Sequence, residues 1–427
     1  MDAIKNTALY RNAERHAALL TPIFEREIRE KSSRYSLAAL LMRAAGRDAR
    51  LQKGILQFVS VLPMLSGGED IYEHYRQFVL PHAGALPPLL SFGARLVAQK
   101  PFRSIGMKAT VWLIEKKVAP RFIIADEKAY SRAKARYAAL GAETNVDFLG
   151  EDVLSWAEAD RYLDFYIKAM RRYGGKEAPF NASVKFSALY PFFKPENYAE
   201  SKRVVAGRYA ELLRVAEETN SCLAVDAERY AEQSIVEAAF FDVLMRPEFR
   251  RVTNAKIALQ TYLKNALGKA ERFVRFAAER RAPFHIRLVK GAYLETERAL
   301  AEQKGWDSPV WGSKKETDES FQETCAFLMA HWGRIFVAPA THNPQSVLFA
   351  QSVAGQMGLR KDPRFTFEVL HGLGEPMCRA LCEKEWRVLV YLPLLKEEGK
   401  LLDAMGYFAR RLEENTAGDN ALHILAM

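Results

Sequence analysis

The sequence lacks a signal peptide and long apolar runs, and it contains little cysteine. Its first residues show neither the apolar core nor the small-residue cleavage site of a secretory signal. No stretch reaches about 18 consecutive apolar residues, so no membrane-spanning helix is expected. The four cysteines include no C-x-x-C pair, which argues against a disulfide framework and favours a reducing compartment. Together these absences predict a cytoplasmic protein.

The composition is that of an ordinary globular protein. Apolar residues make up 49% of the chain and charged residues 27%, which are typical proportions for folded domains. A length of 427 residues allows a large core. It predicts one large domain with a smaller one, or two to three domains.

The net charge of +10 is concentrated in the first third of the chain. Residues 1–140 contain 23 Lys and Arg against 12 Asp and Glu, whereas the remainder is close to neutral. The densest stretch, 95–121, carries seven cations and one acid among many apolar residues. This pattern fits peripheral contact with an anionic membrane, and a solvated helical face is the alternative. No zinc-finger spacing or RNA-binding motif accompanies the charge, so no nucleic acid is expected as a partner.

The rest of the chain alternates between two patterns. Short β-branched or aromatic runs, each ending in a polar residue, alternate with amphipathic stretches of helical period. The runs predict eight strands, at 145–150, 182–189, 223–228, 257–263, 284–293, 335–343, 365–372 and 386–393. Eight strand–helix units predict an α/β fold, a (β/α)8 TIM-like barrel whose active site lies at the carboxyl ends of its strands. We expect this barrel in residues 141–427 and a basic, mainly helical region in residues 1–140.

Polar side chains stand at the predicted strand ends, where a barrel would bring them together at one mouth. They are Lys185, Asp226, Gln260, Arg287, Lys290, Thr341, His342, His371 and Tyr391. Each one alone is typical of a solvated loop, but the whole set in one register predicts a shared site. The histidines have no metal-binding spacing, so no metal is expected. The cationic mouth suits an anionic cofactor and an anionic substrate.

The stretch LLDAMGYFARRLEEN (401–415) predicts a final helix that adds two more cations. Arg410 and Arg411 point about 100° apart on a helix, so they can approach one carboxylate from two sides, or hold a carboxylate and a phosphate. The alternative is a solvent-facing pair in which Glu414 is the i,i+4 partner of Arg410.

Seven motifs resemble, in the same order, those of the proline dehydrogenase family, including the flavin-dependent half of the bifunctional proline utilization A enzymes. They are SVKFSAL, LAVDAE, LQTYL, IRLVKGAY, ATHN, LHGLGE and YFARRLEEN. The resemblance implies a flavin-bearing (β/α)8 barrel with FAD as cofactor. It also implies oxidation of L-proline to pyrroline-5-carboxylate by hydride transfer to flavin N5, with electrons passed to a membrane quinone. The alternatives are a hydroxyproline dehydrogenase, or an inactive relative that binds membrane or nucleic acid.

The resemblance also implies roles for individual residues. The catalytic set would be Lys185, Asp226 and Arg287, with Asp226 holding Lys185 and Tyr391 in place and Arg287 near the flavin N5. The substrate would be bound by Lys185, Tyr293, Leu370, Tyr391, Tyr407, Arg410 and Arg411. FAD would be held by Ala227, Gln260, Arg287, Val289, Lys290, Gly291, Ala292, Thr341, His342, Asn343, Arg411 and Glu414.

The chain departs from the family pattern in three respects. Leu294 stands where members often have Trp after the GAY triplet, which affects one contact with the substrate ring. The N-terminal region does not resemble the ribbon-helix-helix DNA-binding module of some bifunctional members. The residues after Arg411 contain no aldehyde-dehydrogenase cysteine motif. We therefore expect a separate pyrroline-5-carboxylate dehydrogenase as a functional partner, and the alternative is that the sequence is a piece of a longer, bifunctional chain.

Overall fold

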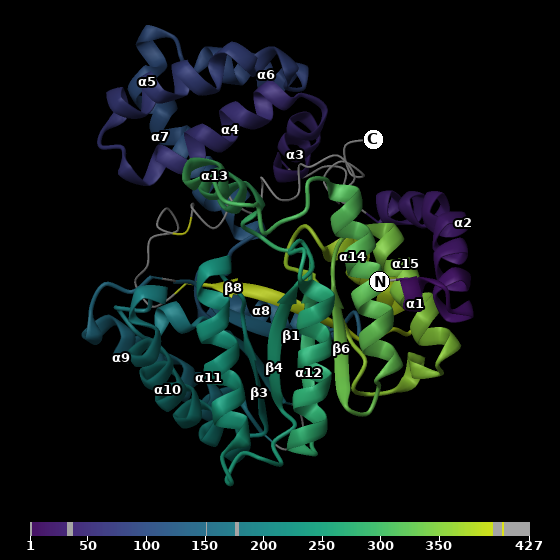
Figure 1. Ribbon diagram of the computed structural model, residues 1–427. Coiled ribbons are helices and arrows are strands. Elements are labelled where there is room, and N and C mark those ends of the chain that lie inside the picture. The colour runs from purple at the N-terminus through teal and green to yellow at the C-terminus, as the bar shows by residue number, and fades with distance from the viewer. Residues whose placement is uncertain (1, 32–36, 151, 176–178, 396–403, 405–427) are drawn as a thin grey trace. The chain divides into compact units, whose positions relative to one another are not determined.

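The computed structural model describes residues 2–31, 37–150, 152–175, 179–395 and 404, and it contains a closed barrel of eight strands (Figure 1). The strands follow one another around the barrel in chain order. They are β1 (Glu143–Phe148), β2 (Phe180–Val184), β3 (Ser221–Val225), β4 (Ala255–Gln260), β5 (Phe284–Val289), β6 (Ile335–Ala340), β7 (Phe367–Leu370) and β8 (Val388–Leu394). Each strand overlaps one predicted run, so the strand number and the (β/α)8 class are confirmed.

Helices alternate with the strands along the chain, as the sequence pattern predicted. They are α9 (Trp156–Tyr173), α10 (Tyr198–Glu218), α11 (Gln233–Met245), α12 (Ala266–Arg280), α13 (Leu294–Lys304), α14 (Lys314–Ala330), α15 (Pro344–Gln356) and α16 (Glu375–Glu383). Three of them begin at a capping side chain: Ser155, Ser313 and Asn343 each accept a hydrogen bond from a backbone N–H three residues later. These caps fix where α9, α14 and α15 begin.

The outer faces of the strands are apolar and pack against the helices. In β2, Phe180, Ala182 and Val184 are buried, and successive residues of a strand point to opposite faces. In β5, the ring of Phe284 lies 5.6 Å from the ring of Phe240 in α11. The residues between these apolar positions therefore face the barrel interior.

The interior of the barrel is unusually polar. Ser183 of β2 contacts Arg287 of β5, and Lys256 of β4 contacts Glu368 of β7. Neither pair of strands is adjacent in the barrel, so these contacts cross its interior. Barrels of this class commonly fill that space with branched apolar side chains. Here part of it holds buried charges instead.

Arg280, the last residue of α12, is a buried cation held by backbone oxygens. Its guanidinium donates to the carbonyl oxygens of Leu244, Phe249 and Pro283, at 3.2, 2.8 and 3.1 Å, and also to that of Val252. Burial lowers the pKa of Arg280 to about 10, so the side chain stays charged at neutral pH. One side chain thus ties together the loops that precede β4 and β5.

Contacts divide the chain into two compact units. The first unit consists of residues 1–21, 141–369 and 384–391, and the second of residues 22–140, 370–383 and 392–427. One boundary falls at Pro22, inside α2 (Ala8–Glu30). In the first unit, which also contains α1 (Asp2–Lys5), the ring of Tyr10 lies 5.0 Å from that of Phe349 in α15. The division into domains 1–140 and 141–427 stays a prediction.

The second unit is mainly helical. Besides α16 and most of α2, its helices are α3 (Leu37–Arg47), α4 (Ala49–Val61), α5 (Gly68–Phe78), α6 (Pro88–Leu96), α7 (Arg103–Leu113) and α8 (Glu127–Ala138). A buried cluster that includes Phe58, Tyr72, Tyr75 and Met107 joins α4, α5 and α7. Within the described ranges, no helix has the length and apolar character needed to cross a membrane.

Candidate active site

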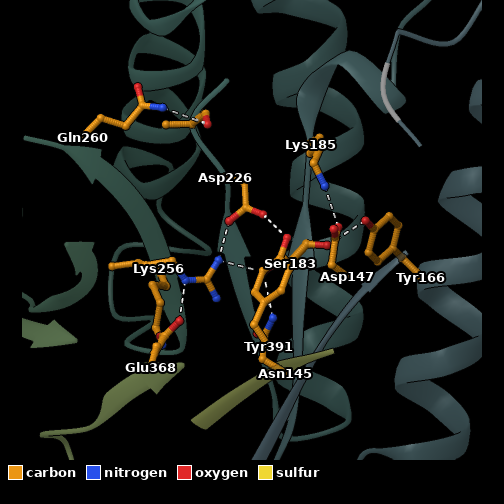
Figure 2. Close-up of polar contacts among 12 residues, drawn as sticks. Asn145, Asp147, Tyr166, Ser183, Lys185, Asp226, Lys256, Gln260, Glu368 and Tyr391 are labelled. Atoms are coloured by element: carbon orange, nitrogen blue, oxygen red, sulfur yellow. Dashed lines mark hydrogen bonds and ion pairs between the residues drawn. The ribbon is translucent and has the colours of Figure 1, made fainter. Parts of the chain in front are cut away.

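A chain of buried charges crosses the barrel interior (Figure 2). The carboxylate of Glu368 in β7 accepts from Nζ of Lys256 in β4 and from Nε of Arg287 in β5, at 2.5 Å in each case. All three side chains are buried. A buried cation is tolerated only when an anion pairs with it, so one carboxylate stabilises two cations here.

The other end of the Arg287 guanidinium reaches the carboxyl ends of β2 and β3. Its Nη1 donates to Oδ1 of Asp226 and, at 2.8 Å, to Oγ of Ser183. The second oxygen of Asp226 accepts from Oη of Tyr391 at 2.8 Å, and the guanidinium carbon lies 5.2 Å from the centre of the Tyr391 ring. The remaining nitrogen, Nη2, is buried and has no hydrogen-bond partner in the described part of the chain. The Nε and Nη1 atoms of Arg287 are therefore held by side chains, whereas Nη2 remains unsatisfied among the described residues.

The charge states of this network follow from mutual pairing. Burial alone would lower the pKa of Arg287, but the carboxylates of Glu368 and Asp226 raise it above its usual value. Burial alone would raise the pKa of Glu368, but Arg287 and Lys256 hold it below its usual range. Both groups therefore remain charged at neutral pH.

Lys185, the residue after β2, pairs with an aspartate that the resemblance did not name. Its Nζ lies 2.6 Å from Oδ1 of Asp147 in β1 (Figure 2). Asp147 pairs in register with Ser183, and Lys185 lies two residues further along on the same face. The contact expected between Asp226 and Tyr391 is present, and Asp147 is a partner of Lys185 in addition to those that the resemblance named. That Asp226 also holds Lys185 in place stays a prediction.

Ser183 connects the two halves of the network. Its Oγ accepts from Nδ2 of Asn145 at 2.8 Å as well as from Arg287, and its carbonyl oxygen accepts from Oη of Tyr166 in α9 at 2.7 Å. Burial raises the pKa of Tyr166 well above its usual value, so this hydroxyl remains a donor. The position of Ser183 is thus fixed from both the barrel interior and the helical layer.

Several residues expected to hold FAD lie at the carboxyl ends of β3 and β4. Gln260, the last residue of β4, is buried, and its Nε2 lies 3.3 Å from the carbonyl oxygens of Ala227 and Glu228. Ala227 follows β3 and belongs to the predicted set. The structure therefore brings Gln260 and Ala227 together.

The expected backbone segment 289–292 continues beyond β5 beside residues 261–262. The N–H of Thr261 donates to the carbonyl of Val289 at 2.9 Å, and that of Tyr262 to the carbonyl of Lys290 at 2.6 Å. Gly291 has φ +135°, and a Cβ there would lie 2.4 Å from the ring of Tyr262. Only glycine fits this conformation and this approach, so the strand end keeps a bare backbone.

The other expected site residues in the first unit lie at the ends of β5 and β6. Nζ of Lys290 contacts Asp318 of α14. Thr341 is buried after β6, and its Oγ1 accepts from the N–H of Asn343 at 3.2 Å. His342 lies between these two residues, Ala292 follows Gly291, and Tyr293 is the residue before α13. Their roles toward a cofactor or substrate remain predictions.

The remaining expected positions belong to the second unit. Leu370 is the last residue of β7, and the next residue, His371, is buried with Nδ1 at 2.8 Å from Oη of Tyr137 in α8. Burial lowers the pKa of His371 to about 4, so its ring is neutral at neutral pH. Four further predicted residues lie outside the described part of the chain. They are Tyr407, Arg410, Arg411 and Glu414.

Sequence reasoning missed the residues that lie within the strands. Asp147, Lys256 and Glu368 are buried inside β1, β4 and β7. Asp147 pairs with Lys185 and Glu368 with Arg287, both of which the sequence singled out, whereas Lys256 pairs with Glu368. The sequence did contain a signal, namely a charged residue within an otherwise apolar strand. When such a residue is buried, it requires a partner of opposite charge nearby. Only the register of the strands in the folded barrel shows which residue is that partner.

A closed parallel barrel with a charged network reaching the carboxyl ends of its strands defines an enzyme of the (β/α)8-barrel class. The residues at those ends belong to a sequence that matches one family over most of its length. The chain belongs to the proline dehydrogenase family, whose model matches residues 130–423.

Individual relatives agree with this family. The chain is 28% identical to the bifunctional protein PutA of Salmonella typhimurium, over 72% of this chain and 24% of that protein. It is 29% identical to the mitochondrial proline dehydrogenase 1 of Arabidopsis thaliana, over 49% of this chain and 42% of that protein. The chain thus spans about a quarter of the length of the bacterial relative.

Solved structures show the same fold. Proline utilization A from Bdellovibrio bacteriovorus, inactivated by N-propargylglycine, superimposes with a TM-score of 0.80 and 24% sequence identity. The match covers 96% of this chain and 42% of that one. At this identity the likeness establishes the fold.

The proline dehydrogenase family consists of flavoenzymes that use FAD, and the residues described above fit that cofactor. Arg287 supplies a buried cation whose Nη2 has no partner in the described ranges, and Gln260 supplies a buried amide. Gly291 leaves the end of β5 bare, and Thr341 adds a hydroxyl after β6. FAD would be held by these groups.

Proposed function

We propose that the chain oxidises L-proline to pyrroline-5-carboxylate, with FAD as the hydride acceptor. The observation that carries this proposal is the guanidinium of Arg287, which is buried near the carboxyl ends of the strands with Nη2 unpartnered among the described residues. A fixed cation beside a ring that gains electrons stabilises the reduced ring. When bound, FAD supplies the two-electron acceptor that no side chain can provide.

The side chains of the barrel mouth orient the substrate. The ammonium of Lys185 binds the proline carboxylate, and Asp147, at 2.6 Å, holds that ammonium in place. Tyr391, fixed by Asp226 at 2.8 Å, offers its ring to the apolar side of the substrate. Anchoring the carboxylate turns the carbon beside the nitrogen toward the cofactor. The substrate binds as the neutral amine, so no protein base is required.

The sequence resemblance supports the remaining parts of this proposal. Arg410 and Arg411 complete the carboxylate site, and the electrons pass to a quinone. A pyrroline-5-carboxylate dehydrogenase consumes the product. Hydroxyproline oxidation is the alternative, and Tyr407 argues against it, because a tyrosine beside the substrate ring leaves less room for a hydroxyl.

The protein loaded with FAD should be yellow, and its flavin absorbance should bleach when L-proline is added without oxygen. Bleaching is expected because the substrate transfers two electrons and no acceptor is present to remove them. The measurement is an anaerobic visible spectrum before and after addition, with trans-4-hydroxy-L-proline as the comparison. A protein that takes up no FAD contradicts the proposal, and faster bleaching by hydroxyproline supports the alternative.

The second unit also supports a peripheral contact with an anionic membrane. Six large apolar side chains are exposed on α6 and α7, namely Leu89, Phe92, Leu96, Ile105, Trp112 and Leu113. Exposed cations accompany them, at Arg95, Lys100, Lys108, Lys116, Lys117 and Arg121. Apolar side chains that enter the interface, next to cations that meet anionic lipid headgroups, are the features of a membrane-binding surface.

The variant Lys100→Glu/Lys108→Glu should bind anionic vesicles at least about ten-fold more weakly, because each cation near such a surface contributes about 1 kcal/mol. Binding of the wild-type chain should also fall steeply between low and physiological salt. Vesicle flotation measures both effects, and Leu154→Ser, at a highly exposed position of the first unit, is the matched control. If vesicle binding changes neither with salt nor with charge reversal, the membrane proposal is contradicted and the region is a solvated helical face.

A further inference from the structure

A row of buried polar side chains lies behind Gln260, and none of the roles described so far uses it. Nζ of Lys269 in α12 donates to Oε1 of Gln233 in α11, and Nε2 of Gln233 donates to Oε1 of Gln260. All three side chains are buried. The row runs from the helical layer to the end of β4.

The ammonium of Lys269 decides which way both amides point. An ammonium has hydrogens but no lone pair, so the atom of Gln233 that faces it must be the oxygen. The nitrogen of Gln233 then faces Gln260 and requires an oxygen there. The two ends of a glutamine amide have nearly the same shape, so hydrogen bonding rather than packing sets these orientations.

The orientation of Gln260 determines what it can offer a ligand. Its oxygen is occupied by Gln233, so its nitrogen points the other way, with the carbonyl oxygens of Ala227 and Glu228 both at 3.3 Å. A primary amide has two N–H groups, and we take the two carbonyls, which are equally distant from Nε2, to share one of them. The second N–H is the group that remains for a ligand.

Lys269 can remain charged in this buried position because it is paired. Its Nζ lies 2.8 Å from Oε1 of Glu237 in α11, and the other oxygen of Glu237 accepts from Arg272. Burial lowers the pKa of Lys269, and Glu237 opposes that shift. The row therefore has a donor-only group at its outer end.

We propose that Lys269 is a positioning residue that acts through Gln233 and makes Gln260 a hydrogen-bond donor only. This inference rests on the proposed function, because it takes Gln260 to face FAD. A donor-only Gln260 selects an acceptor atom of the flavin, a ring carbonyl oxygen or an unprotonated ring nitrogen. Such an atom accepts more strongly when the ring is reduced, so the row favours the reduced flavin over the oxidised one.

The variant Lys269→Met should bind FAD about ten-fold more weakly, and the midpoint potential of its bound flavin should be lower. The reason is that the side-chain amides of Gln233 and Gln260 can then rotate by 180° and exchange their oxygen and nitrogen positions. Fluorescence titration of FAD into flavin-free protein and anaerobic potentiometry measure the two quantities. Arg272→Met is the matched control, because Arg272 binds the same Glu237 from the same helix. It should leave both values unchanged.

A double-mutant cycle separates positioning from packing. In a Gln233→Leu background, Lys269→Met should have no further effect on FAD affinity, because the connection is already broken. An equal effect in both backgrounds would overturn the proposal. The variant Gln233→Glu keeps Lys269 paired, so it serves where Lys269→Met does not fold. A carboxylate cannot donate, so Gln260 must turn its oxygen to the ligand and FAD affinity should fall about ten-fold.

The outcomes separate this inference from the function on which it rests. Wild-type protein that binds no FAD contradicts the proposed function. Wild-type protein that binds FAD and is bleached by proline, with unchanged affinity and potential in both Lys269→Met and Gln233→Glu, contradicts the positioning role alone.

Discussion

Replacing Glu368 by Leu should lower the free energy of unfolding by about 3–5 kcal/mol. The substitution leaves Lys256 and Arg287 buried without the carboxylate that both contact at 2.5 Å. The cost comes from leaving Lys256 without this carboxylate and Arg287 with Asp226 alone, rather than from the loss of one contact. Urea unfolding at neutral pH, followed by circular dichroism, measures the change.

A surface ion pair provides the control for this experiment. Glu295 lies 3.2 Å from Arg298 on α13 and is largely exposed, so Glu295→Leu should cost less than about 1 kcal/mol. The double variant Lys256→Met/Glu368→Leu should be more stable than Glu368→Leu alone, since it also removes the buried charge of Lys256, which has lost its partner. Equal losses in Glu368→Leu and Glu295→Leu would show that the buried network adds nothing beyond a surface pair.

Glu368 should also make stability depend on pH. Its pKa in the folded chain lies below the value of 4.5 expected for a free side chain, because Arg287 and Lys256 outweigh the effect of burial. A carboxylate with a lowered pKa contributes stability above its unfolded pKa and loses it as the pH falls through its folded value. Acidification below about pH 4.5 should therefore destabilise the wild-type chain more steeply than Glu368→Leu.

The second large effect is expected for Arg287→Lys, which should slow flavin reduction by proline about 100-fold. Lysine keeps the charge but has one nitrogen, so it cannot contact Glu368 and Asp226 and still present a further N–H to the cofactor. The measurement is stopped-flow absorbance at saturating proline, with bound FAD confirmed beforehand.

Ser183→Ala is the companion variant for this experiment. It removes the 2.8 Å contact to Nη1 but leaves the guanidinium, with its two carboxylate partners, in place. We expect a fall of less than about ten-fold, the value of one neutral hydrogen bond. If Arg287→Lys reduces its flavin at a rate within about three-fold of the wild-type rate, the guanidinium of Arg287 does not stabilise the reaction.

The strands and the residues at their ends were accessible to sequence reasoning. Short β-branched or aromatic runs mark the strands, and the polar residue that ends a run marks the barrel mouth. Gln260 and Tyr391 were found in this way, and both lie in the network or beside it. Such residues can be predicted from the sequence because each one is a polar residue next to an apolar run.

The pairing inside the barrel was not accessible in the same way. Lys256 and Glu368 lie 112 residues apart, and their contact depends on the register and curvature of several intervening strands. The contact between Asp147 and Lys185 likewise depends on the pairing and register of β1 with β2. Apolar periodicity carries no information on these long-range choices.

The position of Glu368 late in the chain has a consequence for biosynthesis. Lys256 and Arg287 emerge from the ribosome 112 and 81 residues before the carboxylate that neutralises them. Until β7 has been translated, the first six strands would have to bury two cations without that partner, which strongly disfavours a closed native intermediate. We therefore expect the growing chain to complete its native barrel core late, and we do not expect a fragment that contains only β1 to β6 to fold independently.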